Sequence, residues 1–440
     1  MTDTAFTVSA AFDRTLFWQH GQSVRYLVVR LNAKRAAAKA KVDRAQLNIA
    51  LAIDASGSMG GGKLEAAKRA ALGLVERMTA ADRLSLVSFA SDVEVHIDAV
   101  PVDAKNRAAI VRQIDQLTTR GMTCLSGGWF AAVECAAAVA EADPKLTARV
   151  IILSDGQANE GITDRNELAE HAGELRQRGV FTSALGIGDD YDELLLRALA
   201  ESGGGRLHDA ELASEISSVL LGEIDDIYET VLDGVELYLS VPQGVRVSML
   251  GKGDGELRDD RLCFQLGAVQ HEIERTAVFR VICPKAIPGE ELVFKVGASG
   301  RPLQGGEPLT ADASAAVLQA AVGVENSAQT PDAKLVPLVA RAWFSHVVAK
   351  AAAMNRVRAY REAGRMVDKE LKHFRVYVAD LADGPALIGQ LELLAQRAER
   401  EMSPRLSKEM VLSSALMMED RIDHRGSGKA SWMDRIRRGE

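Results

Sequence analysis

The sequence predicts an α/β protein whose central part is an open, mostly parallel sheet with helices on both faces, a doubly wound arrangement. Three observations predict it. From Leu47 to about Ile227, short apolar runs alternate with longer amphipathic segments. Residues 234–298 change to short alternating runs broken by Gly, Pro and Asp, which favour a small antiparallel β-sandwich. Beyond this part, apolar residues recur at spacings of three and four, which indicate an α-helical domain.

The elements of the α/β part follow from apolar runs bounded by turn residues and from helical spacing of apolar positions. The run from Leu47 to Asp54 has no charge before its final acid, so it predicts a strand buried on both faces. After it we expect, in order, helix 63–78, strands 84–90 and 93–98 as a hairpin pair, helices 103–117 and 126–141, strand 149–153, helix 164–178, strand 180–185, helix 191–201, a short strand 205–208 and a helix from Glu211.

Two strand-like runs precede this part, at Phe6–Phe12 and Val24–Leu31. Two strands cannot form a domain by themselves, so they must pair with strands later in the chain. The five runs of the sandwich (235–241, 245–250, 262–266, 277–283 and 292–296) are the natural partners. We therefore expect the α/β domain to be inserted into the sandwich. The basic, alanine-rich residues 33–44 are interpreted as a solvated linker rather than as a contact for an anion.

The C-terminal part is expected to be helical from Ala311 to Ile422, with helices at 337–363, 366–381, 385–402 and 404–422 after a Gly- and Pro-rich link. The resulting domains are 1–44 (strands that pair with the sandwich, and a linker), 45–230 (α/β), 231–300 (sandwich), 301–425 (helical) and 426–440 (a basic, flexible tail). The tail carries Trp432, Met433 and Ile436 among basic residues, so an amphipathic docking peptide is the alternative to a frayed end.

Composition narrows the function classes. The chain of 440 residues is 47% hydrophobic and 26% charged, as in folded proteins, and its net charge of −8 argues against nucleic acid as the main partner. The first thirty residues lack a signal-peptide pattern, and no run is long enough to span a membrane, so we expect a cytoplasmic protein with no membrane partner. Its 4 cysteines form no CxxC pair, and we expect free thiols; a Cys263–Cys283 disulfide is the alternative.

The strand from Leu47 ends in an acid, a glycine and two hydroxyl residues. Asp54, Ser56 and Ser58 alternate, so a tight loop around Gly57 can turn all three side chains to one point. A carboxylate and two hydroxyls are oxygen ligands, and such a set suits a hard divalent cation such as Mg²⁺. This loop alone predicts a cation site at the carboxyl end of a buried strand.

Two later stretches add donors at the same edge of the sheet. A second buried strand ends at Ser154-Asp155-Gly156, which places Asp155 beside Asp54 because parallel strands end at one edge. The helix before that strand opens with Gly121-Met122-Thr123, so the Thr123 hydroxyl can reach the same edge. Oxygen donors from three loops are thus expected to converge.

These three motifs, in this order, resemble the metal-ion-dependent adhesion site of a von Willebrand factor type A domain. The resemblance covers about residues 45–228, and the wider order of domains is similar to bacterial stand-alone type A proteins and to the core of inter-alpha-trypsin-inhibitor chains. It implies that Ser56 and Ser58 bind the ion directly, that Thr123 binds it directly or through water, and that Asp54 and Asp155 act largely through waters. The ion would be Mg²⁺, with Mn²⁺ or Ca²⁺ as alternatives.

The resemblance further implies a non-enzymatic scaffold in which an Asp or Glu of a partner protein completes the coordination of the ion; self-association is open. Two alternatives remain: an accessory subunit of an AAA+ ATPase or of a kinase/phosphatase assembly, and a metal-dependent phosphohydrolase. Against the hydrolase, the opening loop has no second Asp as nucleophile, and His96 and His208 are isolated from the motifs. Glu160 is expected near the rim, and Cys124 is expected to pack rather than bind the ion.

Overall fold

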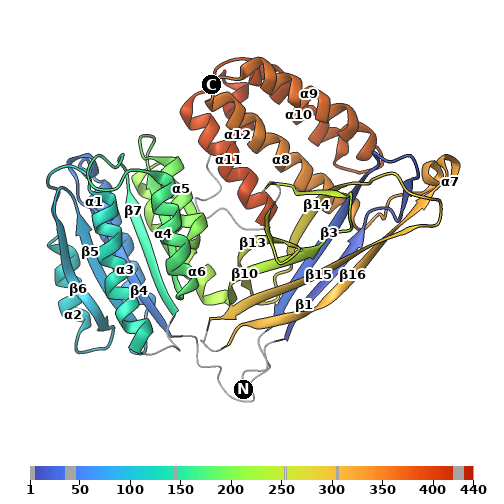
Figure 1. Ribbon diagram of the computed structural model, residues 1–440. Helices are drawn as coiled ribbons and strands as arrows, with labels where there is room; N and C mark the ends of the chain where they lie inside the picture. The colour runs from blue at the N-terminus through green and yellow to red at the C-terminus, as the bar shows by residue number, and fades with distance from the viewer. Residues whose placement is uncertain are drawn as a thin grey trace.

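The computed structural model describes residues 5–34, 46–142, 147–251, 253, 255–303, 307–419 and 431–439. It has three parts, which Figure 1 shows side by side: an α/β domain, a two-sheet β-sandwich and a layer of helices packed over the sandwich. The helical layer lies beside α5 of the α/β domain as well as on the sandwich. All three parts therefore contact one another.

The α/β domain is built on a six-stranded sheet in the order β6-β5-β4-β7-β8-β9. All its neighbouring pairs are parallel except β5 with β6, which forms an antiparallel edge. The strands are β4 (Leu47–Asp54), β5 (Arg83–Phe89), β6 (Val93–Pro101), β7 (Thr147–Ser154), β8 (Val180–Ile187) and β9 (Gly204–Ala210). This confirms the predicted mostly parallel α/β fold, and β4, the central strand, is buried along its whole length.

Helices cover both faces of this sheet because the side chains of each strand alternate between two cores. Ile49, Leu51 and Ile53 pack with α1, α2 and α6, whereas Ala50 and Ala52 pack with α3, α4 and α5. The helices are α1 (Lys63–Arg77), α2 (Arg107–Asp115), α3 (Leu125–Ala142), α4 (Arg165–Gln177), α5 (Glu193–Ser202) and α6 (Ile216–Glu229). The small alanines of β4 leave room for α3 to lie close to the sheet.

The first sheet of the sandwich contains the N-terminal strands. Its order is β1-β3-β14-β11, and β3 pairs antiparallel with both β1 and β14. The strands are β1 (Ala5–Phe12), β3 (Val24–Lys34), β11 (Arg246–Met249) and β14 (Arg275–Ile282). The chain thus leaves this sheet at β3, forms the α/β domain, and returns to the sandwich at β10.

The second sheet extends further along the sequence than we expected. Its order is β12-β13-β10-β15-β16-β2, with strands β2 (Leu16–Trp18), β10 (Thr230–Ser240), β12 (Glu256–Arg258), β13 (Arg261–Gln270), β15 (Glu291–Pro302) and β16 (Leu309–Ala321). The prediction of helix from Ala311 is therefore wrong up to Ala321, and the sandwich does not end at residue 300. β16 pairs with β15 over most of the length of β16, and these backbone hydrogen bonds favour a strand over a helix for this segment.

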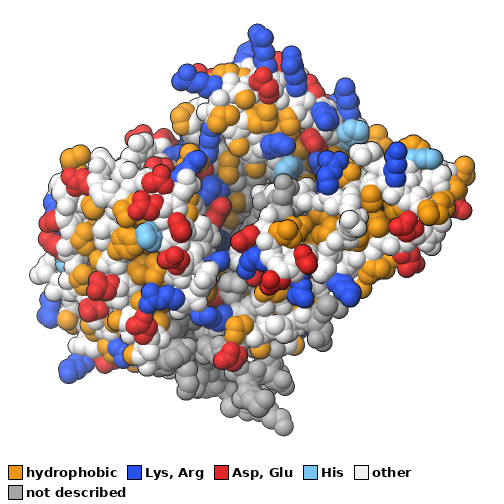
Figure 2. All heavy atoms as spheres, viewed as in Figure 1, with side chains coloured by type: hydrophobic (Ala, Val, Ile, Leu, Met, Phe, Trp, Pro, Cys, Tyr) orange, Lys and Arg blue, Asp and Glu red, His pale blue; other side chains and the backbone are white. Residues whose placement is uncertain are grey.

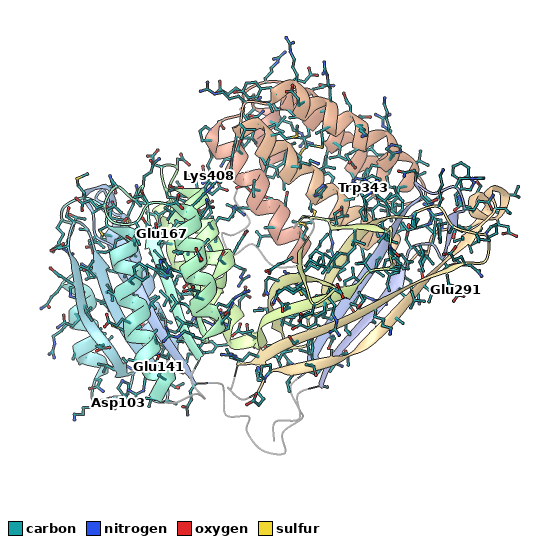
Figure 3. All side chains as sticks on the ribbon, viewed as in Figure 1. Asp103, Glu141, Glu167, Glu291, Trp343 and Lys408 are labelled. Atoms are coloured by element: carbon teal, nitrogen blue, oxygen red, sulfur yellow. The ribbon has the colours of Figure 1, made fainter. Side chains whose placement is uncertain are left out.

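The helical layer consists of α8 (Val336–Arg356), α9 (Tyr360–Tyr377), α10 (Gly384–Ala398), α11 (Pro404–Glu419) and α12 (Trp432–Arg437), whereas the short α7 (Gly323–Ala328) lies apart, next to β2 at the end of the sandwich (Figure 1). The helical layer covers the outer face of the first sheet, where Tyr26 and Val28 pack with its helices. Trp343, labelled in Figure 3, lies at this junction: its ring centroid is 5.3 Å from that of Tyr26, and its indole N–H donates to Glu370 (2.6 Å). Because Leu27 and Val29 face the sandwich core, β3 is buried on both faces.

The C-terminal end is ordered where the structure describes it, so the prediction of a flexible tail is wrong for residues 431–439. Ser431 caps α12 by accepting a hydrogen bond from the backbone N–H of Asp434 (3.2 Å). Trp432, Met433 and Ile436 are buried in the core of the helical layer. The apolar residues noted in the sequence dock within the same chain.

All four cysteines are free, as expected for the thiols of this chain. Among the described helices, none combines the length and the apolar character that crossing a membrane requires.

Candidate metal centre

Asp54 ends the central strand β4 and lies fully buried at the carboxyl edge of the sheet. One carboxylate oxygen accepts the backbone N–H of Ser56 (2.8 Å), and the other accepts the Ser154 hydroxyl (2.6 Å). Burial raises the pKa of Asp54 above its ordinary value, although these hydrogen bonds act in the opposite direction. A nearby cation would therefore stabilise the ionised form of this buried carboxylate.

The loop after β4 carries the two serines toward a second carboxylate. Ser56 and Ser58 lie with their hydroxyl oxygens 2.9 Å apart, and the Ser58 hydroxyl donates to Asp155 (2.6 Å). A short 3-10 turn at Gly57–Met59 produces this approach, because it reverses the chain within three residues. Asp155 is buried at the end of β7, while Ser58 faces solvent.

Thr123 reaches the same edge from the loop before α3. Gly121, at a left-handed φ of 56°, turns this loop, and its carbonyl accepts the backbone N–H of Gly57 (3.2 Å). The carbonyl of Thr123 in turn accepts the N–H groups of Asn159 and Glu160 (3.2 and 3.3 Å). The three loops therefore hold one another through their backbones.

Gly156 shows where the side chains of the three loops converge. A Cβ atom at this glycine would lie 3.4 Å from the Thr123 hydroxyl, 3.5 Å from the Ser58 hydroxyl and 4.0 Å from an Asp54 carboxylate oxygen. Oxygen atoms of the first and second motifs thus face the small space beside Gly156, which belongs to the third. With Ser56 and Asp155 bonded to Ser58, the structure brings all five predicted residues together.

The donor set fits a hard divalent cation. It offers two carboxylates and three hydroxyls, with no nitrogen or sulfur, and the exposed Ser58 marks the side open to solvent. In the described part of the chain, no three His, Cys, Asp or Glu side chains form a cluster able to hold a metal. The described residues therefore contain no site built from these four residue types alone. An ion at the carboxyl edge of the sheet would need the serine and threonine hydroxyls as ligands.

Lys63 is a site residue that sequence reasoning missed. Its ammonium nitrogen lies 2.5 Å from the Asp155 carboxylate oxygen that does not contact Ser58. Lys63 is the first residue of α1, where the helix dipole disfavours a positive charge. A lysine at this unfavourable position is the one signal in the sequence that could have pointed to a partner acid. Ser154, the last residue of β7, was also unassigned, although its hydroxyl donates to Asp54.

The remaining candidate residues have structural partners. His208 lies 2.7 Å from Glu223, a fully buried acid, and His96 lies 2.6 Å from the Ser88 hydroxyl. Glu160 contributes a backbone N–H to the Thr123 loop, which places it near the rim as expected. Cys124 is partly buried beside Thr123.

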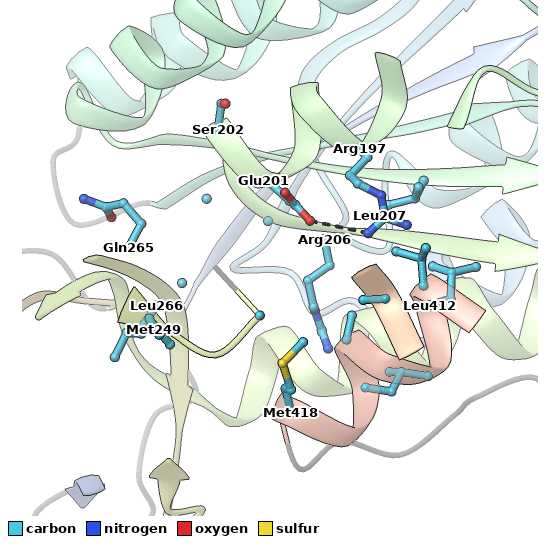
Figure 4. A pocket seen from close by; sticks show the side chains of 18 of the residues that line it. Arg197, Glu201, Ser202, Arg206, Leu207, Met249, Gln265, Leu266, Leu412 and Met418 are labelled. Carbon is cyan, nitrogen blue, oxygen red and sulfur yellow. Dashed lines mark hydrogen bonds and ion pairs between the residues drawn. The ribbon is translucent and has the colours of Figure 1, made fainter. Parts of the chain in front are cut away.

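A cavity of about 770 Å³ lies between the three parts of the molecule, away from the five site residues. Figure 2 shows the surface hollowed there, and Figure 4 shows polar residues of the α/β domain facing apolar residues such as Met249, Leu412 and Met418. Four arginines line it. Arg197 and Arg206 pair with the acids Glu201 and Glu223, whereas Arg176 donates to the side-chain oxygen of Gln265 and Arg275 donates to a backbone carbonyl.

Comparison with known proteins places this geometry in a family context. Residues 48–220 match the model of the von Willebrand factor type A domain. Residues 48–220 are therefore a type A domain, and the matched range includes the six-stranded sheet except for Leu47, the first residue of β4.

Curated relatives share only part of this chain. The uncharacterized protein sll0103 of Synechocystis sp. is 27% identical over 281 residues, which cover 60% of this chain and 64% of that protein. Inter-alpha-trypsin inhibitor heavy chain H1 of Sus scrofa is 27% identical over 194 residues, which cover 43% of this chain and 22% of that one. The alignments thus span less than two thirds of the length of these relatives.

Two solved structures resemble nearly the whole chain. A von Willebrand factor type A protein from Catenulispora acidiphila has a TM-score of 0.69 at 15% identity, covering 94% of this chain and 96% of that one. The ArnB paralog VWA2 from Sulfolobus acidocaldarius has a TM-score of 0.57 at 16% identity, covering 93% and 98%. At these identities the likeness concerns the fold, and it extends beyond the type A domain.

Proposed function

We propose that the type A domain is a Mg²⁺-dependent protein-binding module, and that it binds partners rather than transforming them. The residues that hold the ion are Asp54, Ser56, Ser58, Thr123 and Asp155. The observation that carries this proposal is the convergence of three loops: oxygen atoms of Asp54, Ser58 and Thr123 face Gly156, and Ser58 donates to Asp155. The presence of a type A domain supports the same role, since this family consists of protein-interaction modules.

The side chains of the site fit this role because each has a defined task. Asp54 and Asp155 are buried and already bonded to serine hydroxyls, so they supply negative charge at a fixed place. Ser58 is exposed, so the site is open on its side. A bound Mg²⁺ supplies an electrophilic centre that an Asp or Glu of a partner can complete. Mn²⁺ and Ca²⁺ are the alternative ions.

Calorimetric titration of the full chain with Mg²⁺ tests the first half of the proposal, and we expect one saturable site. Capture of a partner on the immobilised chain tests the second half: we expect retention in Mg²⁺, release by EDTA, and loss when the contacting Asp or Glu of the partner is changed to Asn or Gln. A partner that stays bound in EDTA would contradict the proposal.

Gly156→Ala should weaken Mg²⁺ binding without harming the fold. Gly156 has no left-handed φ, so its backbone tolerates alanine, but the new methyl group would occupy the space that the site oxygens face. We expect the affinity for Mg²⁺ to fall roughly tenfold or more, since even outer partners of a metal ligand contribute that much. Gly173→Ala is the matched control, because its Cβ would meet nothing within 4 Å. Equal affinities in the two variants would show that this space is not the ion site.

A further inference from the structure

Lys63 places a positive charge inside the proposed metal centre. Its ammonium group pairs with the Asp155 carboxylate, whose side chain has an exposed fraction of 0%, whereas 32% of the Lys63 side chain is exposed. Asp155 thus has two partners, the Lys63 ammonium on one oxygen and the Ser58 hydroxyl on the other. On the solvent side, a Cβ at Gly188 would lie 3.7 Å from the Lys63 nitrogen, so a glycine of the loop after β8 lies next to it.

The charge balance of the site depends on this lysine. When Asp54 and Asp155 are ionised, the two carboxylates and Lys63 together carry one negative charge; without Lys63 they carry two. A divalent ion then leaves the site with a net charge of one positive unit when Lys63 is present and with none when it is absent. Loss of Lys63 would therefore increase the attraction of the empty site for a cation and decrease the attraction of the ion-loaded site for a partner's carboxylate.

We propose that Lys63 is a built-in counter-cation that weakens the binding of the divalent ion and strengthens the binding of the partner's acidic group to the loaded site. This inference rests on the proposed function. Lys63 is a positioning residue in this sense: it acts through Asp155 and through its charge, with no place among the oxygen ligands. The site would be tuned for capture of an acid rather than for tight retention of metal.

A structural role alone predicts a different pattern. If Lys63 served only to orient Asp155, its loss would misplace that carboxylate. The binding of the ion and the binding of the acid would then both become weaker. If it served only to start α1, its loss would change stability and neither affinity. The opposite changes in the two affinities therefore distinguish the counter-cation from a purely structural lysine.

The test uses the full chain with Mn²⁺ as the ion and acetate as the acid. Free Mn²⁺ is measured by its electron paramagnetic resonance signal, and acetate binding by the relaxation of its methyl protons near bound Mn²⁺. One unit charge beside a divalent ion changes affinity about tenfold even at the dielectric constant of water. For Lys63→Met we expect Mn²⁺ to bind roughly tenfold more tightly, and acetate to bind the Mn²⁺-loaded site roughly threefold more weakly.

Two variants serve as controls. Lys63→Arg keeps the charge, so both affinities should stay within about twofold of wild type. Arg69→Met removes one positive charge from an exposed position of the same helix and should change neither affinity. Thermal unfolding of the metal-free proteins checks that each variant is folded.

The outcomes separate this inference from the function on which it rests. If wild-type protein binds no Mn²⁺, the proposed function fails and the inference fails with it. If wild type binds Mn²⁺ but Lys63→Met binds it equally or less tightly, or binds acetate equally or more tightly, the inference alone is overturned.

Discussion

Replacing Asp54 by asparagine is expected to abolish Mg²⁺ binding, with a loss of affinity of roughly a hundredfold or more. Asparagine has nearly the shape of aspartate, so its side-chain oxygen can still accept the backbone N–H of Ser56, and the Ser154 hydroxyl can rotate to accept from the amide. The change thus removes charge from the site with little change in packing. Calorimetric titration with Mg²⁺ gives the affinity directly.

The same substitution should not lower the stability of the metal-free protein. Burial raises the pKa of Asp54, so at neutral pH the folded state carries a cost for the ionised carboxylate that the unfolded state does not. Asparagine removes that cost. We therefore expect Asp54→Asn to unfold at the same or a higher temperature than wild type at pH 7, and the difference to shrink as pH falls through the raised pKa.

Asp92→Asn is the control for Asp54→Asn, because it removes an acid near the same edge that is exposed and paired with Arg120. Its Mg²⁺ affinity should stay within about twofold of wild type, since exposed ion pairs are strongly screened. If Asp54→Asn still binds Mg²⁺ as wild type does, the ion is not held at this edge.

The sequence was sufficient to predict the α/β fold and the meeting of the site residues, for one physical reason. A strand with no charge before its last residue, such as Leu47–Asp54, is buried on both faces and must therefore lie inside a parallel sheet. The residues that follow such strands then share one edge, which joins Asp54 and Asp155 although they are far apart in the chain. Their binding of an ion stays a proposal.

Strand β16 was mistaken for helix because its composition suggests one. Residues 309–321 are rich in alanine, the strongest helix former, and charged residues are scarce there. The alternation was nevertheless present: Ala316, Leu318 and Ala320 are buried, and Val317 and Gln319 between them are exposed. Pairing with β15 makes this segment a strand, and the helix or strand propensity of the residues themselves does not reveal such a partner.

The partner of Lys63 and the docking site of the C-terminal helix could not be identified from patterns, because both depend on distant contacts. The ion pair of Lys63 joins residues separated by 92 positions. Trp432 packs near Phe344 of α8, with ring centroids 6.3 Å apart, and this docking replaces the flexibility that a chain end otherwise has. The place of Lys63 at the start of α1 is unfavourable for a lysine, but no local pattern identifies Asp155 as its partner.

Arg405→Met is expected to destabilise the junction between the helical layer and the α/β domain by about 3–5 kcal/mol, the cost of leaving a buried charge without its partner. Arg405, on α11, donates to both carboxylate oxygens of Asp209 on β9 at 2.9 and 2.6 Å. Burial by itself lowers the pKa of Arg405, but the hydrogen bonds and the charge of Asp209 raise it overall. Both side chains are at least nine-tenths buried, so water cannot replace the pair.

Neighbouring contacts make this pair the centre of the junction. Lys408, one turn later on α11 and labelled in Figure 3, donates to the carbonyls of Asp189 and Tyr191 (2.6 and 3.0 Å). The hydroxyl of Tyr191 donates to Asp209 (2.8 Å), so the carboxylate serves both contacts. Loss of Arg405 therefore removes a charge that balances Asp209, and it weakens the contacts that hold Lys408 in place.

Hydrogen exchange is the measurement that locates this effect, because a chain with several parts need not unfold in one step. We expect faster exchange in β9 and α11 of Arg405→Met and little change in β4. Adding Asp209→Asn should restore much of the protection, since it removes the charge that Arg405 balanced. Arg437→Met, at a pair in which the arginine is 65% exposed, should have an effect below about 0.5 kcal/mol. Uniformly faster exchange across the type A domain in Arg405→Met would mean that this pair maintains the domain itself, and unchanged exchange would mean that the apolar contacts of the junction suffice without it.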